Sequence, residues 1–382
     1  MDGKRKNVVV LGASGSVGSS ALAVLREAKD QFRITGMSGF RRMKELAALC
    51  REFDVPCAVA ADPAFYSELK TLLPEKVCLA GIEGMTALAE APETDILFCA
   101  VAGADALLPV AAALKAGKKV ALASKEVLVL AGELIAALGA PEQLLPVDSE
   151  HAALWQCLQG REKNEVKKLL LTASGGPFRT WEKEKILKAS VAEALRHPTW
   201  SMGRKITVDS ASMMNKALEL IEARHLFDVP PEKLGVIVHP QSRIHAMAEL
   251  TDGSLIAQAG MPDMRLPAAW ALNYPDRRTY NFPPYDWRTG ETLTFFEPDK
   301  EKFPSFGFAE AALKAGGTLP GVMSAANDAA VARFLDGKIP FGGIWQIIGK
   351  MMEQHTVRPQ GSIEEMIALD RETRIKALEM KL

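Results

Sequence analysis

Cysteine is scarce in this sequence, and its distribution excludes two kinds of site. Five cysteines are scattered along 382 residues, and no two of them form a CxxC pair. An odd number of widely spaced cysteines predicts neither a disulfide framework nor a zinc knuckle. We therefore expect a protein of a reducing compartment, located in the cytoplasm.

The sequence also lacks an excess of charge and any long apolar run. Lys and Arg number 46 against 47 for Asp and Glu. No basic stripe alternates with aromatic residues, so nucleic acid is not expected as a partner. The apolar run that begins at Val8 breaks into glycines and serines after Leu11. We therefore predict neither a signal peptide nor a membrane span, and no membrane partner.

Length and composition are those of a multidomain globular protein. A chain of 382 residues is too long for one ordinary hydrophobic core. Hydrophobic residues make up 48% and charged residues 24%, which is ordinary for a folded chain and gives no indication of disorder. Two or three domains are expected.

The first 150 residues alternate strand-like and helix-like segments, which predicts a Rossmann-like, doubly wound parallel sheet of the α/β class. An apolar strand ending at Leu11 runs into Gly12, Gly15 and Gly18. Glycines after a buried strand let backbone N–H groups approach a pyrophosphate at a helix N-terminus. The spacing is GxxGxxG rather than GxGxxG, so the pattern gains weight only from its place in the series. Five more strands are expected at Phe32–Gly39, Cys57–Asp62, Ile96–Gly103, Lys118–Ser124 and Gln143–Ser149.

Two arginines and no acidic residue follow the second predicted strand, in the segment Ser38-Gly39-Phe40-Arg41-Arg42. An acidic side chain at this point of the fold accepts a hydrogen bond from a ribose 2′-hydroxyl, whereas arginine pairs with a 2′-phosphate. The segment therefore favours NADP(H) over NAD(H). The alternative is that both arginines only open a solvated helix.

The segment from His197 to Ala223 combines a histidine, a tryptophan, several serines, an asparagine, a lysine and a glutamate. We expect a loop, a strand and then a helix from Met213, with Ser210 and Ser212 at its N-cap. Asn215, Lys216 and Glu219 lie three or four residues apart, so they can share one side of that helix. A capped amphipathic helix with a solvated polar face is the structural alternative.

Three carboxylates suggest a metal site. Asp148 and Glu150 are two residues apart at the end of the last predicted strand, so both can face the same way. Glu219 provides a third carboxylate. Hard oxygen ligands of this kind suit Mg²⁺ or Mn²⁺.

Hydroxyl, amide and ammonium groups suggest a phosphate site. Ser174 lies in a turn, Ser174-Gly175-Gly176, that can offer a hydroxyl and backbone N–H groups to an anion. Together with Ser210, Asn215 and Lys216 it would form a clamp with one compact cation. Lys125 directly follows the fifth predicted strand, where ligands bind in open sheets; the alternative is a Lys–Glu pair that opens a helix.

Residues 175–204 combine Pro177, Pro198, Trp200 and Gly203, and read as a long loop with one helix. Long loops over an active site usually act as lids. Trp200 would then cover a bound substrate, although an aromatic residue in the domain core is an equally good interpretation.

Several long motifs together resemble the 1-deoxy-D-xylulose 5-phosphate reductoisomerase family, over about Val8 to Leu335. They are GASGSVG, SKE, LLPVDSEHAA, LTASGGPFR, HPTWSMGRKITVDSASMMNKALELIEA, HPQSRIHAMAELTDGSLIAQAGMPDMRLP and LTFFEPD. The resemblance implies NADPH- and divalent-metal-dependent conversion of 1-deoxy-D-xylulose 5-phosphate to 2-C-methyl-D-erythritol 4-phosphate, in non-mevalonate isoprenoid biosynthesis. It also implies a homodimer that binds a small sugar phosphate.

The resemblance implies a role for individual residues. As metal ligands it implies Asp148, Glu150 and Glu219, with Mg²⁺ or Mn²⁺ bound and Co²⁺ also possible, and Lys125 joins them as catalytic. The substrate contacts would come from Ser149, Ser174, His197, Trp200, Ser210, Asn215 and Lys216. The expected cofactor contacts come from Gly12, Ser14, Gly15, Ser16, Val17, Gly39, Arg41, Arg42, Ser124, Glu126, Gly203 and Met264.

The chain departs from the family pattern at three places. Ser124 stands where the family usually has Asn before Lys-Glu. Arg41 and Arg42 stand where it often has an Asn. The usual Ala-Ala-Asn-Glu of the last domain ends in Asp328. None of these positions belongs to the expected metal ligands or phosphate clamp.

The expected domain order follows from these segments. We predict an NADPH-binding domain over 1–148, then a catalytic, metal-binding and dimerisation domain over 149–285, whose mobile loop is about 175–204. A linker over 286–303 and a small helical domain over 304–382 would complete the chain. Residues 235–260 read as two or three strands with a hairpin at Asp252-Gly253, and as a dimer seam.

Two other functions fit parts of the pattern. A simple NADP-dependent aldehyde or semialdehyde dehydrogenase can share the glycine-rich start, but an acylating member needs an activated cysteine. Cys157 lies in a predicted amphipathic helix and nothing in the sequence marks it as activated. A nucleotide-sensing binding protein without catalysis is the third possibility. His239 and His245 are expected to be structural.

Overall fold

A computed structural model describes residues 5–200 and 202–382. Residues 1–4 of the predicted first domain and Ser201 of the predicted loop lie outside the described residues. The chain forms two compact units. The first unit comprises Met1–Val127, Ile135–Ala152 and Asp263–Phe282, and the second unit comprises Leu128–Leu134, Ala153–Pro262 and Pro283–Leu382. The predicted domain boundaries stay a prediction beside this division.

The first unit contains a parallel sheet with strand order β4-β3-β2-β1-β5-β6-β7. The chain moves outward from β1 in both directions, which confirms the doubly wound prediction. The strands are β1 (Lys6–Leu11), β2 (Phe32–Gly39), β3 (Cys57–Ala60), β4 (Val77–Ala80), β5 (Ile96–Cys99), β6 (Lys119–Leu122) and β7 (Leu144–Pro146). The sequence prediction missed β4, a four-residue edge strand whose first residue, Val77, is exposed.

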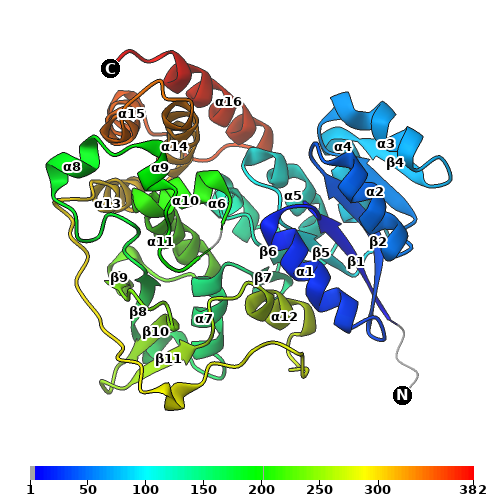
Figure 1. Ribbon diagram of the computed structural model, residues 1–382, viewed down its shortest axis with the longest axis horizontal. Coiled ribbons are helices and arrows are strands. Elements are labelled where there is room, and N and C mark those ends of the chain that lie inside the picture. Colours follow the sequence, from blue (N-terminus) through cyan, green and yellow to red (C-terminus); the bar gives the residue numbers. More distant parts are fainter. Residues whose placement is uncertain (1–4, 201) are drawn as a thin grey trace. The chain divides into compact units, whose positions relative to one another are not determined.

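Helices surround this sheet, with α1, α2, α4 and α5 visible around the blue and cyan strands in Figure 1. The side chains of Val8, Val9, Val10 and Leu11 in β1 are almost fully buried, as expected for a central parallel strand covered on both faces. α12 packs against α1, β6 and β7. The helices are α1 (Ser16–Glu27), α2 (Met43–Glu52), α3 (Tyr66–Leu72), α4 (Gly81–Glu90), α5 (Leu107–Lys115) and α12 (Arg265–Asn273).

Two helices divide their residues between the units, namely α6 (Glu126–Ala136) and α7 (Ser149–Cys157). Short 3₁₀ turns connect several elements: η1 (Pro63–Phe65), η2 (Ala104–Ala106), η3 (Pro141–Gln143), η4 (Lys163–Glu165), η5 (Pro231–Lys233) and η6 (Trp287–Thr289). None of the helices in the described part of the chain is long and apolar enough to cross a bilayer.

The second unit contains a four-stranded sheet in the order β11-β10-β8-β9. Its strands are β8 (Val166–Ala173), β9 (Leu234–Val238), β10 (Ile244–Leu250) and β11 (Leu255–Ala259). β8 and β9 are parallel, whereas β10 is antiparallel to both β8 and β11. Gly253, at φ +88°, supplies the left-handed turn between β10 and β11, which confirms the predicted hairpin.

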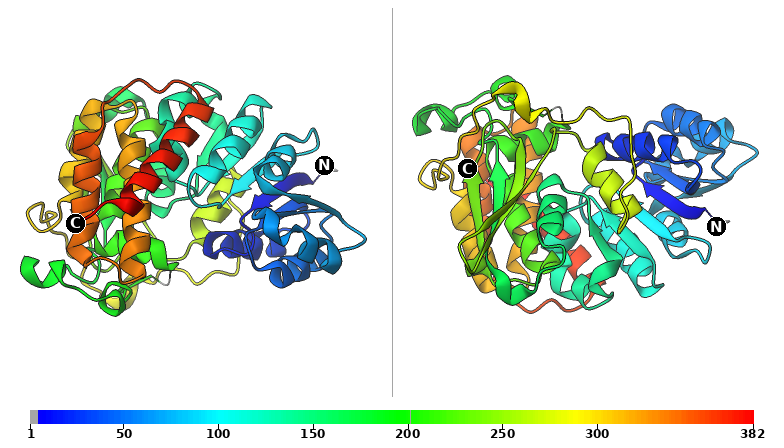
Figure 2. Two further views of the ribbon diagram at one scale, coloured as in Figure 1. Left: turned by 90° about the horizontal axis from the view of Figure 1, so that it is seen from above. Right: turned by 90° about the horizontal axis from the view of Figure 1, so that it is seen from below.

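The remaining helices of the second unit include the predicted C-terminal helical region. They are α8 (Lys183–Leu187), α9 (Val191–Ala194), α10 (Arg204–Ala211), α11 (Met214–Leu226), α13 (Ser305–Ala315), α14 (Leu319–Leu335), α15 (Phe341–Gln354) and α16 (Ile363–Glu379). α14 packs against α10, α11, α13, α15 and α16, and the adjacent orange and red helices can be followed in Figure 2. Its many Ala, Gly and Ser residues allow this close approach on several sides.

Two local predictions were wrong. The expected strand before α11 is the helix α10, and Ser210 lies inside it rather than at an N-cap. The β-branched run Ile206-Thr207-Val208 suggests a strand, but burial of Thr207 and Val208 against neighbouring helices outweighs that propensity. The predicted loop over 175–204 contains two short helices, α8 and α9, instead of one.

Candidate active site

The β1–α1 turn of the first unit has the geometry that its glycines predict. Gly12 has φ +81°, and a Cβ atom there would lie 2.4 Å from the Ala100 carbonyl oxygen. A Cβ at Gly18 would lie 2.2 Å from the Gly12 carbonyl oxygen, so α1 packs directly on the turn. The Gly12 N–H donates to the Ser38 Oγ at 3.0 Å. The turn therefore lies beside the end of β2, which brings Ser14, Gly15, Ser16, Val17 and Gly39 to one edge of the sheet.

The two arginines after β2 lie at the same edge. Arg42 donates to the Ser14 carbonyl oxygen and forms an ion pair with Glu45 at 2.9 Å. Arg41 donates to Asp62 at 3.2 Å, and its guanidinium lies 4.7 Å from the centre of the Phe40 ring. Both side chains remain more than half exposed. Their charge is thus available at the point where the sequence predicts a 2′-phosphate.

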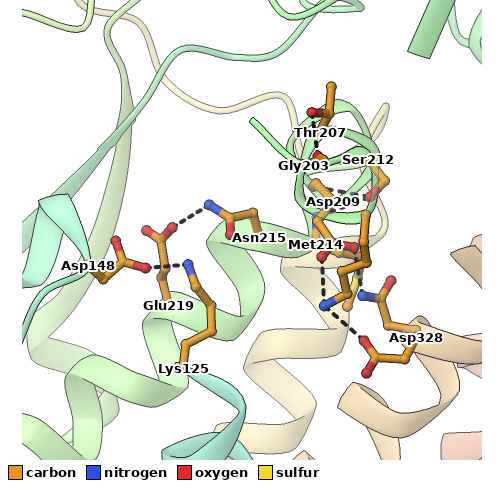
Figure 3. A network of polar contacts seen from close by, with 12 residues as sticks. Lys125, Asp148, Gly203, Thr207, Asp209, Ser212, Met214, Asn215, Glu219 and Asp328 are labelled. Carbon is orange, nitrogen blue, oxygen red and sulfur yellow. Dashed lines mark hydrogen bonds and ion pairs between the residues drawn. The ribbon is translucent and has the colours of Figure 1, made fainter. Parts of the chain in front are cut away.

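At the ends of β6 and β7, Lys125 and Asp148 form a buried ion pair (Figure 3). The two residues are 5% and 9% exposed, which is unusual for charged groups and requires that they be paired. Burial alone would raise the pKa of Asp148, but the charge of Lys125 beside it holds that pKa well below its usual range. Asp148 is therefore an anion in this structure.

The sequence predicts Glu150 at the end of a strand. In the structure Glu150 lies in the first turn of α7, where it accepts a hydrogen bond from Ser149. β7 ends at Pro146, so the chain has already turned into the helix. A carboxylate oxygen of Glu150 still lies within 4.8 Å of one of Asp148. The predicted convergence of these two carboxylates is thus observed in the first unit, by a route other than strand alternation.

Sequence reasoning missed His151, which is fully buried with its Nδ1 3.8 Å from Asp148 Oδ1. Its position three residues after Asp148 could have indicated the contact. Ser124, whose predicted contact with the cofactor stays a prediction, is buried at this edge, and its hydroxyl donates to the Val101 carbonyl oxygen at 2.5 Å. It therefore ties the end of β6 to the segment that follows β5.

In the second unit, His197 joins two predicted phosphate ligands. Its Nε2 lies 3.2 Å from Ser174 Oγ and 3.0 Å from Ser210 Oγ. Its Nδ1 accepts from the backbone N–H groups of Thr199 and Trp200 at 3.2 and 2.9 Å. Since Nδ1 accepts, Nε2 carries the proton in the neutral ring. Burial lowers the pKa of His197 to about 4, so the ring is an uncharged donor at neutral pH.

On α11, the three polar groups predicted to share one side do so. Asn215 donates to one carboxylate oxygen of Glu219 (Figure 3). The Lys216 ammonium pairs with the other oxygen. Lys216 is 3% exposed and Glu219 is fully buried. The alternative of a solvated polar face is therefore wrong. α11 follows α10 after only Ser212 and Met213, which places these groups close in sequence to Ser210.

The end of the predicted lid loop contacts the segment between β9 and β10 and the start of β10. The Trp200 ring is half-buried, with its centre 6.1 Å from that of His245, and Thr199 Oγ1 lies 3.5 Å from Ser242 Oγ. Gly203 and Met264 are the N-cap residues of α10 and α12, and Glu126 begins α6. The cofactor contacts predicted for these last three residues stay predictions.

The two histidines expected to be structural are buried. His239 Nδ1 donates to the Thr294 carbonyl oxygen at 2.9 Å, and its Nε2 accepts from the Arg243 N–H at 3.1 Å. Cys157 is 3% exposed at the end of α7, and burial raises the pKa of its thiol to about 11. Neither His239 nor Cys157 therefore has the features of a reactive group.

Three family profiles match the sequence. One described as 1-deoxy-D-xylulose 5-phosphate reductoisomerase matches residues 8–132. Its C-terminal domain profile matches residues 144–227, and a further profile described as DXP reductoisomerase C-terminal domain matches residues 259–376. Together they span most of the chain.

Individual relatives agree with the profiles. The 1-deoxy-D-xylulose 5-phosphate reductoisomerase of Trichlorobacter lovleyi is 47% identical over 370 residues, which cover 96% of this chain and 95% of the relative. That of Geotalea uraniireducens is 45% identical, with 98% of both chains covered. The solved structure of the Zymomonas mobilis enzyme in complex with NADPH has a TM-score of 0.91 and 40% identity, with 98% of both chains covered. A DOX-P reductoisomerase structure in complex with NADPH, fosmidomycin and magnesium has a TM-score of 0.92 and 37% identity, with 97% of both chains covered.

Proposed function

The chain belongs to the 1-deoxy-D-xylulose 5-phosphate reductoisomerase family, and from this premise we propose how its own residues divide the reaction. It is an NADPH- and divalent-metal-dependent enzyme that rearranges and reduces 1-deoxy-D-xylulose 5-phosphate to 2-C-methyl-D-erythritol 4-phosphate. The observation that carries the assignment is identity of 47% over nearly the whole chain. The roles of single residues are our proposal.

NADPH binds along the carboxyl-terminal edge of the first sheet in this proposal. The close approach of α1 to the turn at Gly12 leaves backbone N–H groups facing a pyrophosphate. Arg41 and Arg42 would meet the 2′-phosphate, because their exposed guanidinium groups lie at the end of β2. Gly15, Ser16, Val17, Gly39, Ser124, Glu126, Gly203 and Met264 are proposed as further contacts.

Asp148, Glu150 and Glu219 would hold the divalent cation. Each offers a carboxylate oxygen, and an all-oxygen set fits Mg²⁺, with Mn²⁺ or Co²⁺ as substitutes. Two of the three carboxylates each pair with a lysine ammonium, Asp148 with Lys125 and Glu219 with Lys216. Both carboxylates therefore already attract a positive charge. When bound, such a cation polarises a ketone and stabilises negative charge on neighbouring oxygens.

The phosphate of the substrate would bind Ser174, His197, Ser210, Asn215 and Lys216. The neutral His197 ring offers its Nε2–H, and the two hydroxyls beside it can turn toward an anion. Lys216 adds the positive charge. Binding of the phosphate, away from the reacting carbons, supplies energy that can order the loop and exclude water.

The remaining residues position the sugar. Ser149, next to both carboxylates of the first unit, would contact a substrate hydroxyl. Lys125 would keep Asp148 ionised and would point its ammonium at the substrate carbonyl or an adjacent oxygen. Trp200 would cover the substrate once the loop over 175–204 closes. We also propose a homodimer, in the cytoplasm, with the strands of residues 235–260 at the seam.

The activity is tested by following the loss of NADPH absorbance with 1-deoxy-D-xylulose 5-phosphate and Mg²⁺ or Mn²⁺. We expect oxidation of NADPH that stops with EDTA and returns with excess metal. Prior treatment with iodoacetamide separates the enzyme from a semialdehyde dehydrogenase, because Cys157 is buried and its thiol protonated. Loss of activity on alkylation would favour the dehydrogenase, and NADPH binding without turnover would favour a sensing protein.

Replacing both Arg41 and Arg42 with Ala is expected to raise the KM for NADPH far more than that for NADH. Each arginine contact to a phosphate is a charge-assisted hydrogen bond of about 1.5–3 kcal/mol, or roughly 10- to 100-fold, so the loss of both predicts an increase of roughly 10²- to 10⁴-fold. Steady-state kinetics with both cofactors give the ratio. Arg51→Ala, in the last turn of α2, serves as a control. An equal loss with NADPH and NADH would show that the arginines support the turn and do not read the 2′-phosphate.

A further inference from the structure

A buried charge network fastens α10 to the C-terminal helices. Asp209, the residue before Ser210, is 2% exposed and accepts from the side-chain amide of Asn327 on α14 at 2.8 Å. Its other oxygen lies 2.9 Å from the Lys205 ammonium, one turn earlier on α10. The same ammonium lies 2.8 Å from Asp328, so one cation bridges two carboxylates on two helices. Figure 3 shows Asp209 and Asp328 joined in this way.

The network continues away from α10 and ends on α16. Asp328 accepts from Arg374 at 2.5 Å, and Arg374 donates to Asp370 at 2.7 Å. Burial raises the pKa of Asp209 in spite of its partners, whereas Lys205 and Arg374 keep that of Asp328 low although burial opposes it. Burying this many charges is costly, so such a network is weak evidence for stability alone. The location of the network is more informative than its contribution to stability.

A second polar connection holds the junction between α10 and α11. The Ser212 carbonyl oxygen accepts from the Ser305 hydroxyl of α13 at 2.7 Å. Ser305 in turn accepts from the Trp345 indole N–H of α15 at 2.9 Å, and it is fully buried. Directly after Ser212, Met213 has φ +61°, a conformation that a residue with a Cβ adopts only when its surroundings impose it.

The residues held in this way are those proposed to bind the phosphate. Ser210 lies directly after Asp209, and Asn215 and Lys216 begin α11 just beyond Met213. The start of the lid loop packs on the same junction, since a Cβ at Gly176 would lie 2.8 Å from the Ser210 carbonyl oxygen. Displacing α10 would therefore move Ser210 away from His197 and from the groups on α11.

We propose that Asp209, with Asn327, Lys205 and Asp328, is a positioning group for the phosphate clamp: it fixes α10 so that Ser210 faces the same ligand as Asn215 and Lys216. The inference rests on the proposed phosphate role of Ser210. Asp328, which departs from the Glu usual in the family, is thus part of the support of the clamp. The C-terminal helices contribute to substrate affinity without contacting the substrate.

Asp209→Asn tests this inference, because it keeps the shape and removes the charge that pairs with Lys205. We expect the KM for the sugar phosphate and the Kd for glycerol 3-phosphate to rise about 10- to 100-fold, the factor for losing one hydrogen bond to a charged group. The kcat and the Kd for NADPH should stay near those of the unchanged enzyme. Asp370→Asn, the same substitution at the far end of the network, is the matched control. It should lower the Tm without changing either constant.

A double variant and a direct variant complete the test. Asp209→Asn with Asn327→Asp exchanges donor and acceptor at constant formal charge, and it should recover most of the lost affinity. If Asp209→Asn does not fold, Asn327→Ala removes only the donor and is measured in its place. The inference would be overturned if neither Asp209→Asn nor Asn327→Ala changed the KM, or if Asp209→Asn and Asp370→Asn had equal effects. If Ser210→Ala leaves the KM unchanged, Ser210 does not bind the phosphate, and the proposed clamp itself is wrong.

Discussion

Replacing Glu150 with Gln is expected to lower kcat by about 10³-fold, since it removes one anionic ligand from a site whose charge is used in the reaction. Gln keeps the size of the side chain and its position in the first turn of α7. NADPH binds elsewhere in our proposal, so the Kd for NADPH, measured by fluorescence titration, should not change. The affinity for Mn²⁺, measured by calorimetry, should fall together with kcat.

Glu75→Gln is a suitable control for this experiment, because Glu75 is exposed and lies between α3 and β4. It should leave both constants unchanged. Weakened NADPH binding in Glu150→Gln, with Mn²⁺ affinity preserved, would contradict the proposed metal site and would move Glu150 to the cofactor site.

Replacing Lys216 with Gln is expected to have the second large effect. The proposed clamp has one cation, and its hydrogen bond to a phosphate is worth about 3 kcal/mol, so KM for the sugar phosphate should rise about 100-fold. The informative measurement is the ratio of kcat/KM for 1-deoxy-D-xylulose 5-phosphate to that for unphosphorylated 1-deoxy-D-xylulose. This ratio should fall by the same factor if Lys216 reads the phosphate.

Two comparisons isolate that effect. Lys188→Gln, on the exposed end of α8, should leave the ratio unchanged. Because Lys216 also pairs with the buried Glu219, its removal can alter metal binding, and the Mn²⁺ affinity of the variant is therefore measured alongside. An equal loss for both substrates would mean that Lys216 acts through Glu219 and does not contact the phosphate.

Features with local causes could be predicted from the sequence. The turn at Gly12 follows from steric limits on φ, and the hairpin at Gly253 from the same limits, so both were found without knowledge of the fold. The doubly wound sheet follows from alternating strands and helices. The shared side of Asn215, Lys216 and Glu219 follows from helical spacing alone.

Features that depend on partners distant in the chain could not be predicted from the sequence. The β-branched run of α10 predicts a strand, and the burial of α10 against α11 and α14, which makes it a helix, cannot be seen in a local pattern. β4 was missed since a short edge strand has little apolar signal. Asp209 and Asn327 are 118 residues apart, and no local spacing indicates their hydrogen bond. The gathering of Ser174 and Ser210 was predicted, but the central position of His197 between them was not.

The neutral His197 ring has a consequence for inhibitor chemistry. Its two backbone donors at Nδ1 and its low pKa mean that, in the clamp we propose, an anionic head group would meet a neutral N–H donor at His197 beside the ammonium of Lys216. Much of the selectivity of such a pocket then lies in the number and direction of acceptor atoms. A head group with fewer negative charges but the same acceptor pattern, such as a sulfonate, would therefore give up less affinity here than in a pocket lined by several basic residues.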